Sequence, residues 1–176
     1  CQAVAQLANE GAPVQLDIHC PPSNIAGMEE QFVMGPAIKL HGPLTDDNDF
    51  FSTICNADIL LMPANFDQKS IDFIRYSMPT RVPAYLASGT PILVYGSANV
   101  AQVRYADDLG WGLVVDKSDI MALQTAIRRL SDDSDLRQNL SNTARNLAHD
   151  LHDAEGIRRK FYDILSNLIV NQERMA

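Results

Sequence analysis

Apolar and polar residues follow one another along this chain in patterns that separate strands from helices. Residues 14–18 carry apolar side chains at every second position, which is typical of a strand with one covered face. Three other apolar runs, within residues 58–62, 92–95 and 113–115, are nearly continuous, as expected of parallel strands covered on both faces. Helical patterns separate these runs. The alternation predicts an α/β fold with a doubly wound parallel sheet.

Local residue types place the ends of the other elements. The opening helix is expected to stop at residues 11–13, and a short helix is expected over residues 25–32. Residues 37–40 predict a further strand, which the glycine and proline at 42–43 end. A longer helix is expected to begin at the threonine or aspartate of positions 45–46, because acidic residues follow in its first turn, where the helix dipole favours them.

Three amphipathic helices are predicted for the last third of the chain. Apolar residues recur there every three or four positions, over residues 120–130, 136–151 and 157–168. The polar stretches at 131–135 and 149–153 separate the three helices. The apolar stripe of the last helix consists of Ile157, Phe161, Ile164, Leu165 and Leu168.

Composition and charge narrow the class of protein. With 176 residues, 46% of them hydrophobic, the chain is large enough to bury one core. Its net charge of −8 argues against a broad surface for nucleic acid or anionic membranes, because both would repel it. No apolar run is long enough for a membrane span, and the sequence has no recognisable leader. The three cysteines form no paired motif, which favours a reducing, cytoplasmic location over a zinc or disulfide framework.

The stretch PTRVPAYLASGTPILVYG contains the strongest local signal. Proline lacks an N–H and fits a helix only in the first turn, so Pro83 must lie near a helix start. Thr80 is then the expected N-cap, and Gly89 the left-handed residue that ends the helix. The amides of Arg81 and Val82 are expected to be unpaired, which together with the guanidinium predicts an anion site. The alternative is that Thr80 only caps the helix and Arg81 is only solvated.

Two loops place this candidate anion site at a favourable edge of the sheet. Residues 63–79 follow one buried strand, and Gly42 and Pro43 end another. Ligands of parallel sheets bind in crevices outside the carboxyl ends of the strands. We therefore expect ligand contacts from both loops.

Three segments, residues 39–67, 76–96 and 111–133, follow one another as in a known family. They resemble the C-terminal, donor-binding domain of the GT-B glycosyltransferases of group 1 (family 4), and the similarity extends over residues 1–176. The resemblance implies a Rossmann-like domain that holds a nucleotide-sugar, preceded by an N-terminal acceptor domain that is absent from this chain. The chain also opens inside a predicted helix and without methionine, so we interpret it as a donor domain that is incomplete at its N-terminus.

The resemblance also implies a set of donor-binding residues. The loop at residues 41–44 would lie along the nucleobase through its main chain, and the segment at 77–81 would meet the phosphates and the sugar. At the two positions where the family carries a pair of glutamates, this chain has Tyr76 and Ala84. The implied residues are His41, Gly42, Pro43 and Leu44 for the base, Ser77, Thr80 and Arg81 for the phosphates and sugar, and Ala84 beside the ribose.

By the same resemblance, the full-length protein would transfer a hexose from a UDP- or GDP-sugar to an acceptor hydroxyl in glycan biosynthesis, without a cofactor or a metal ion. The fragment alone would be inactive, because groups that stabilise the leaving diphosphate would be absent. In the resembled architecture the last helix packs across the domain junction, so part of its apolar stripe would be exposed in this fragment and would favour self-association. The resemblance assigns no catalytic residue to this chain. The alternative is a degenerate, non-catalytic domain for assembly or weak nucleotide binding, which the missing glutamates favour.

Two other motifs have a metal-binding alternative. Asp47, Asn48 and Asp49 spell a DxD motif, but acidic residues are common in the first turn of a helix. His149 and His152 are spaced closely enough to share a metal, but their position between two helices favours a role at the junction. We therefore expect no metal site.

Overall fold

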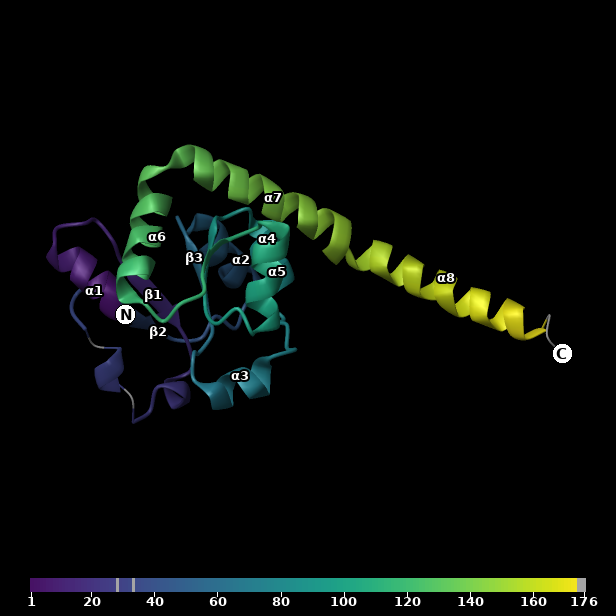
Figure 1. Cartoon of the computed structure of the whole chain (residues 1–176), viewed down its shortest axis with the longest axis horizontal. Coiled ribbons are helices and arrows are strands. Elements are labelled where there is room, and N and C mark those ends of the chain that lie inside the picture. Colours follow the sequence, from purple (N-terminus) through teal and green to yellow (C-terminus); the bar gives the residue numbers. More distant parts are fainter. Residues whose placement is uncertain (28, 33, 174–176) are drawn as a thin grey trace.

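Parallel strands in two groups form the centre of the fold (Figure 1). The computed structural model describes residues 1–27, 29–32 and 34–173. The strands are β1 (Leu16–His19), β2 (Ile38–His41), β3 (Leu60–Pro63), β4 (Ile92–Tyr95) and β5 (Leu113–Val115). β1 pairs with β2, and β3, β4 and β5 pair in that order. The predicted α/β class and parallel pairing are confirmed, but the described residues form two sheets rather than one.

Helices connect the strands and cover the larger sheet on both faces. The α-helices are α1 (Gln2–Asn9), α2 (Asp47–Asn56), α3 (Gln68–Ile74), α4 (Val82–Ser88), α5 (Ala101–Leu109), α6 (Ile120–Asp132), α7 (Ser134–His152) and α8 (Ala154–Glu173). The prediction of one helix over residues 25–32 is wrong, because two 3₁₀ helices, η1 (Pro22–Asn24) and η2 (Glu29–Gln31), lie in this region. Gly27, between them, has a φ of 79°, which is incompatible with a continuous α-helix. Met28 of the predicted helix lies outside the described residues.

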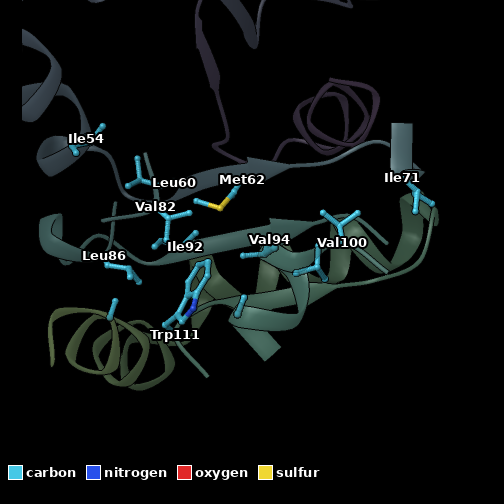
Figure 2. Packing of buried hydrophobic residues seen from close by; sticks show 13 residues of the cluster. Ile54, Leu60, Met62, Ile71, Val82, Leu86, Ile92, Val94, Val100 and Trp111 are labelled. Atoms are coloured by element: carbon cyan, nitrogen blue, oxygen red, sulfur yellow. The ribbon is translucent and has the colours of Figure 1, made fainter. Parts of the chain in front are cut away.

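Side chains of the β3–β4–β5 sheet point alternately into two hydrophobic cores. Met62 and Val94 are fully buried in the first core, which residues of α2, α4, α5 and α7 also line (Figure 2). Leu93 and Val115 belong to the second core, which residues of α6 and α7 line. Trp111 is fully buried in the first core. Because both faces are covered, the strands of this sheet are apolar at consecutive positions.

Aspartates explain where several helices begin. Asp46 is the N-cap of α2 and accepts hydrogen bonds from two amides of the first turn, at 2.8 and 3.1 Å, so the helix begins after Asp46 rather than Thr45. Asp133 ends α6 and accepts a hydrogen bond from an amide of α7 at 2.8 Å. Such a cap contributes about 0.5–2 kcal/mol to stability. The polar stretch at 131–135 is a helix boundary, as predicted.

The last helix, α8, extends away from the two sheets (Figure 1). Its apolar side chains are exposed to solvent: Ile157 is 49% exposed, Phe161 58% and Ile164 59%. The predicted exposure of this stripe is confirmed for these residues, whereas the side chain of Leu168 lies outside the described residues. No helix in the part of the chain that the structure describes has the length and apolar character of a membrane span.

Candidate functional site

The start of α4 differs from the predicted arrangement by one residue. The N-cap residue is Arg81, and its side chain makes no capping hydrogen bond. The amide of Val82 donates to the carbonyl of Pro79, at 3.1 Å. The backbone carbonyl of Pro79 therefore accepts the hydrogen bond that the Thr80 hydroxyl was expected to accept as N-cap. The predictions of Thr80 as N-cap and of an unpaired Val82 amide are wrong.

The other boundary residues of α4 lie where the sequence predicts them. Pro83 is the second residue of the helix, and Gly89 ends it with a φ of 69°. A β-carbon at Gly89 would meet only the guanidinium of Arg145, the end of a flexible side chain, so the positive φ rather than space favours glycine here. These two residues fix the length of α4 and therefore the place of the turn that precedes it.

Arg81 is the cationic group of this turn. Arg81, Thr80 and Ser77 are all exposed. Among the described residues, no carboxylate forms an ion pair with Arg81. A guanidinium presents five N–H donors whose planar arrangement matches phosphate oxygens. The candidate anion site therefore depends on this side chain and the neighbouring hydroxyls, and less on helix amides than the sequence indicates.

Positions 76 and 84 differ in burial. Tyr76 is 84% exposed, whereas Ala84 is half-buried and packs against the first core. Neither side chain offers a carboxylate, so a ribose beside this turn would obtain no charge-assisted hydrogen bond from these positions.

The end of β2 carries a hydrogen-bonded cluster that the sequence analysis did not find. Nε2 of His41 and Oδ1 of Asp17 lie 2.6 Å apart, and the rings of His41 and His19 stack with centroids 4.6 Å apart. A hydrogen bond from Gln15, together with His41 and Lys39, lowers the pKa of Asp17 against a smaller opposing effect of burial. The parallel register of β1 and β2 assembles this cluster. The sequence shows polar residues at alternate positions of both strands. It does not show which residue of β1 lies opposite which residue of β2, so the cluster could not be predicted.

Two helices bring the predicted loops to the same end of the molecule. α2 follows the loop at 42–46 and packs against α4. α2 follows β2, and α4 follows β3 and α3, so each helix begins after the carboxyl end of a strand. The Thr90 hydroxyl, just after α4, donates to the carbonyl of Ile54, in the last turn of α2, at 2.7 Å, so the two helices end side by side. Within the described residues, however, no hydrogen bond or ion pair joins the 41–44 loop to the 77–84 segment. The structure places the two groups at one edge without direct contact.

Two cavities lie away from the predicted donor residues. One, of about 320 Å³, lies between the end of α4 and α7, and the other, of about 280 Å³, lies between α1 and α6. The first is lined by Asp58, Gly89, Pro91, Ser134, Arg137, Gln138, Ser141 and Arg145, and the second by Leu7, Ala12, Pro13, Val14, Ile127, Arg128, Ser131 and Asp132. The predicted donor residues line neither of these two cavities, and all of them except Leu44 and Ala84 are exposed.

The residues with a metal-binding alternative do not converge. His149 pairs with Asp150, which raises the pKa of this exposed histidine, whereas His152 Nε2 lies 2.8 Å from the Tyr105 hydroxyl. The acidic residues of the DxD motif lie in the first turn of α2. Across the described part of the chain, no three His, Cys, Asp or Glu side chains are placed to hold one metal ion.

Comparisons with known proteins bear on the fold. No protein-family model and no curated protein matches this sequence. Similar solved structures include WaaG, a glycosyltransferase involved in lipopolysaccharide biosynthesis, with a TM-score of 0.60 and 20% identity. Sucrose-phosphate synthase from Thermosynechococcus elongatus has a TM-score of 0.65, and α,α-trehalose-6-phosphate synthase from Burkholderia multivorans 0.68, each with 17% identity.

The coverage of these matches shows how much of each protein is shared. The similarity covers 93%, 96% and 98% of this chain, but only 41%, 42% and 39% of the three structures in the same order. This chain therefore spans about two-fifths of their length and has the Rossmann-like fold of one domain of GT-B glycosyltransferases. The fold that the sequence motifs imply is confirmed.

Proposed function

We propose that this chain is the sugar-donor domain of a glycosyltransferase that transfers a hexose from a UDP- or GDP-sugar to an acceptor hydroxyl. The observation that carries this proposal is the exposed guanidinium of Arg81, without an ion pair among the described residues, at the start of α4. The similarity to three sugar-processing enzymes supports the fold, but a fold hosts many functions. Binding of a sugar nucleotide is therefore inferred from the side chains of this turn.

Arg81 would bind the diphosphate of the donor. The overall negative charge of the protein repels anions, so a diphosphate has to be held by local donors. A charge-assisted hydrogen bond to phosphate contributes about 1.5–3 kcal/mol. As the bond between the sugar and the diphosphate breaks, negative charge grows on the leaving oxygen, and a fixed guanidinium stabilises it. The hydroxyls of Ser77 and Thr80 would donate to the remaining phosphate or sugar oxygens.

The rest of the catalytic cleft would come from an N-terminal domain of a longer, cytoplasmic protein. Most of the proposed donor residues are exposed, and the three similar structures are each more than twice as long as this chain. The second domain would supply the acceptor site and the catalytic base, and it would contact the exposed stripe of α8. Without it, the 176-residue chain should bind UDP or GDP only with a Kd on the order of 1 mM.

A non-catalytic domain is the second candidate. It is favoured by Tyr76 and Ala84, which leave the ribose without the carboxylates that the family resemblance implies. Such a domain would retain the fold and a weak affinity for nucleotides but would not promote transfer. Binding without turnover therefore separates this candidate from the first.

The experiment uses the longer protein with UDP- and GDP-hexoses and measures the release of nucleoside diphosphate, with nucleotide binding followed by calorimetry. We expect release with one of the two donor classes and an at least tenfold lower rate in Arg81→Ala, because about 1.5 kcal/mol or more is lost. Arg129→Ala, an exposed arginine on α6, is the matched control and should leave the rate unchanged. Binding without release supports the non-catalytic candidate, and absence of both contradicts the proposal.

A further inference from the structure

One face of α7 carries polar side chains toward the end of α4. The two helices pack against each other (Figure 1). Arg137, Ser141 and Arg145 are spaced four residues apart on α7, so they lie on one face of this helix. All three line the cavity of about 320 Å³ at the end of α4, together with Gly89 and Pro91. Two arginine side chains of one helix therefore face the same cavity.

The guanidinium of Arg137 is held in place by the end of α6. Its Nη1 donates to the carbonyls of Leu130 and Ser131, at 2.7 Å each. A guanidinium has further N–H donors on Nε and Nη2. Among the described residues, no acceptor is bound to these two nitrogen atoms of Arg137. One side of this guanidinium is thus fixed by the protein, and the other side has donors left for a ligand.

Arg145 packs against the end of α4. Its guanidinium lies against Gly89, in the space that a β-carbon at this position would occupy. The Arg145 side chain makes no hydrogen bond or ion pair with any residue that the structure describes. A cation near the last turn of a helix is favoured by the helix dipole, which accounts for the position of Arg145. The dipole does not use the N–H donors of this guanidinium, so all of them remain available.

The charges that line this cavity differ from those of the protein as a whole. The net charge of the chain is −8, whereas the cavity has two guanidinium groups and the carboxylate of Asp58. Within the part of the chain that the structure describes, Asp58 forms no ion pair with Arg137 or Arg145. Ser134 and Gln138 also line the cavity and add a hydroxyl and an amide. The cavity therefore offers cationic donors and, separately, an anionic acceptor.

We propose that this cavity binds a small phosphate monoester that carries further hydroxyl groups. Arg145 follows Arg137 by eight residues, or about 12 Å along the helix, so the two long side chains can approach one phosphate from two sides. Guanidinium donors match phosphate oxygens in geometry and charge. A hydroxyl of the ligand would donate to the carboxylate of Asp58. The volume of about 320 Å³ lies at the lower end of the range for small-molecule sites, which favours a ligand smaller than a nucleotide-sugar.

This cavity and Arg81 lie at opposite ends of α4. Asp58 precedes β3, and Gly89 and Pro91 precede β4, so the cavity lies at the amino ends of these strands. Arg81 precedes the first residue of α4, and the seven residues of this helix span about 10 Å. The inference therefore does not depend on sugar-nucleotide binding at Arg81, and the two can fail separately.

A nuclear magnetic resonance titration of the 176-residue chain with glycerol 3-phosphate, inorganic phosphate and glycerol tests the proposal. We expect saturable shifts of the Gly89 and Ser141 amides, with a Kd on the order of 1 mM for glycerol 3-phosphate. Inorganic phosphate should bind more weakly, and glycerol, which has no phosphate, should cause no such shifts.

Arg145→Ala should weaken binding of glycerol 3-phosphate about tenfold or more, because charge-assisted hydrogen bonds are lost. The variant should fold like the wild type, since this side chain is exposed and has no hydrogen bond to lose. Arg158→Ala removes the same charge from an exposed position of α8 and is the matched control. It should leave the affinity nearly unchanged.

Asp58→Asn should act in the opposite direction on inorganic phosphate. Loss of the carboxylate removes a repulsion at an exposed position and should tighten binding of inorganic phosphate about twofold to fivefold. The same variant should reduce the advantage of glycerol 3-phosphate over inorganic phosphate, because a neutral amide oxygen is a weaker acceptor for the ligand hydroxyls. An arginine that only supports the fold would produce neither change.

Three other outcomes would contradict the proposal. Equal losses in Arg145→Ala and Arg158→Ala would indicate a general attraction of anions to positive charge. Binding that is lost in Arg81→Ala and kept in Arg145→Ala would place the phosphate at the start of α4. Absence of saturable shifts at Gly89 would mean that the two arginines of α7 only support the ends of α4 and α6.

Discussion

The two sheets contain strands of similar length with the same parallel pairing, yet they bury their side chains differently. In β4, Ile92, Leu93 and Val94 are all buried, whereas in β2 only the first residue is buried and the next three, through His41, are exposed. Helices cover both faces of the larger sheet, while the β1–β2 sheet keeps a polar face. The net contribution of a strand's hydrogen bonds is modest, so burial under helices decides which sheet forms a core.

This difference also divides the proposed donor site. Residues 41–44, for the base, lie at the end of β2 and in the loop after it, whereas residues 77–84, for the phosphates and sugar, lead into α4, whose Val82 and Ala84 pack in the first core. Binding groups are effective when rigid elements hold them in place. We therefore expect the phosphate side of the site to be fixed by this chain and the base side to depend on the rest of the protein.

The largest predicted effect is the difference in stability lost when leucine is replaced by alanine in each of the two sheets. Leu93→Ala, in β4, removes a side chain that is 2% exposed and should lower the free energy of unfolding by about 2–5 kcal/mol through lost burial and a cavity. Leu40→Ala is the same substitution in β2 at a side chain that is 36% exposed, and it should cost less than about 1 kcal/mol. Urea denaturation of the 176-residue chain measures both. Equal losses would mean that the β1–β2 sheet is as well packed as the other.

The next effect concerns the phosphate side of the site. Arg81→Ala should weaken nucleoside diphosphate binding to the longer protein by about 1.5–3 kcal/mol, because a charge-assisted hydrogen bond is lost. The melting temperature should hardly change, since the side chain is exposed and makes no capping hydrogen bond. Titration calorimetry measures the affinity, with Arg129→Ala as control. A similar loss in both variants would indicate a general charge effect rather than a contact.

Ala84→Glu tests whether the ribose lies beside α4. A carboxylate there would accept hydrogen bonds from the ribose hydroxyls and should tighten UDP or GDP binding to the longer protein about tenfold, or about 1.4 kcal/mol. The 2′,3′-dideoxy nucleotide lacks these hydroxyls and should gain almost nothing. Calorimetry with both nucleotides separates the two cases. Unfolding of the variant, or an equal gain for both ligands, would make position 84 only a packing position against the first core.

The smallest effect is a pH dependence in the less covered sheet. The pKa of Asp17 is lowered in the folded protein by its bonds to Gln15 and His41, so its stabilising effect is present above the unfolded pKa, near 3.9. This effect is lost as the pH falls through the lower, folded pKa. Because the side chain is 40% exposed, Asp17→Asn should cost less than about 1 kcal/mol at pH 6. The difference from wild type, measured by urea denaturation, should shrink toward pH 3; a constant difference contradicts this account.

The sequence by itself determined the elements whose causes are local. The apolar runs of β3, β4 and β5, the turn at Gly89 and the amphipathic C-terminal helices follow from periodicity, backbone conformation and caps, all of which act over a few residues. The place of the proposed phosphate contact at the start of α4 was predictable to within one residue for the same reason. Pro83 and Gly89 leave little freedom in where a seven-residue helix begins and ends.

Only the tertiary structure decided how distant segments meet. Asp17 and His41 lie 24 residues apart and form their pair because β1 and β2 adopt one particular register, which the packing of whole strands selects. The amide of Val82 donates to the Pro79 carbonyl rather than to the Thr80 hydroxyl, because residues 79–82 form a hydrogen-bonded turn. The division into two sheets and the contact of Ala84 with the first core bring together residues that are far apart in the sequence, which no local pattern encodes.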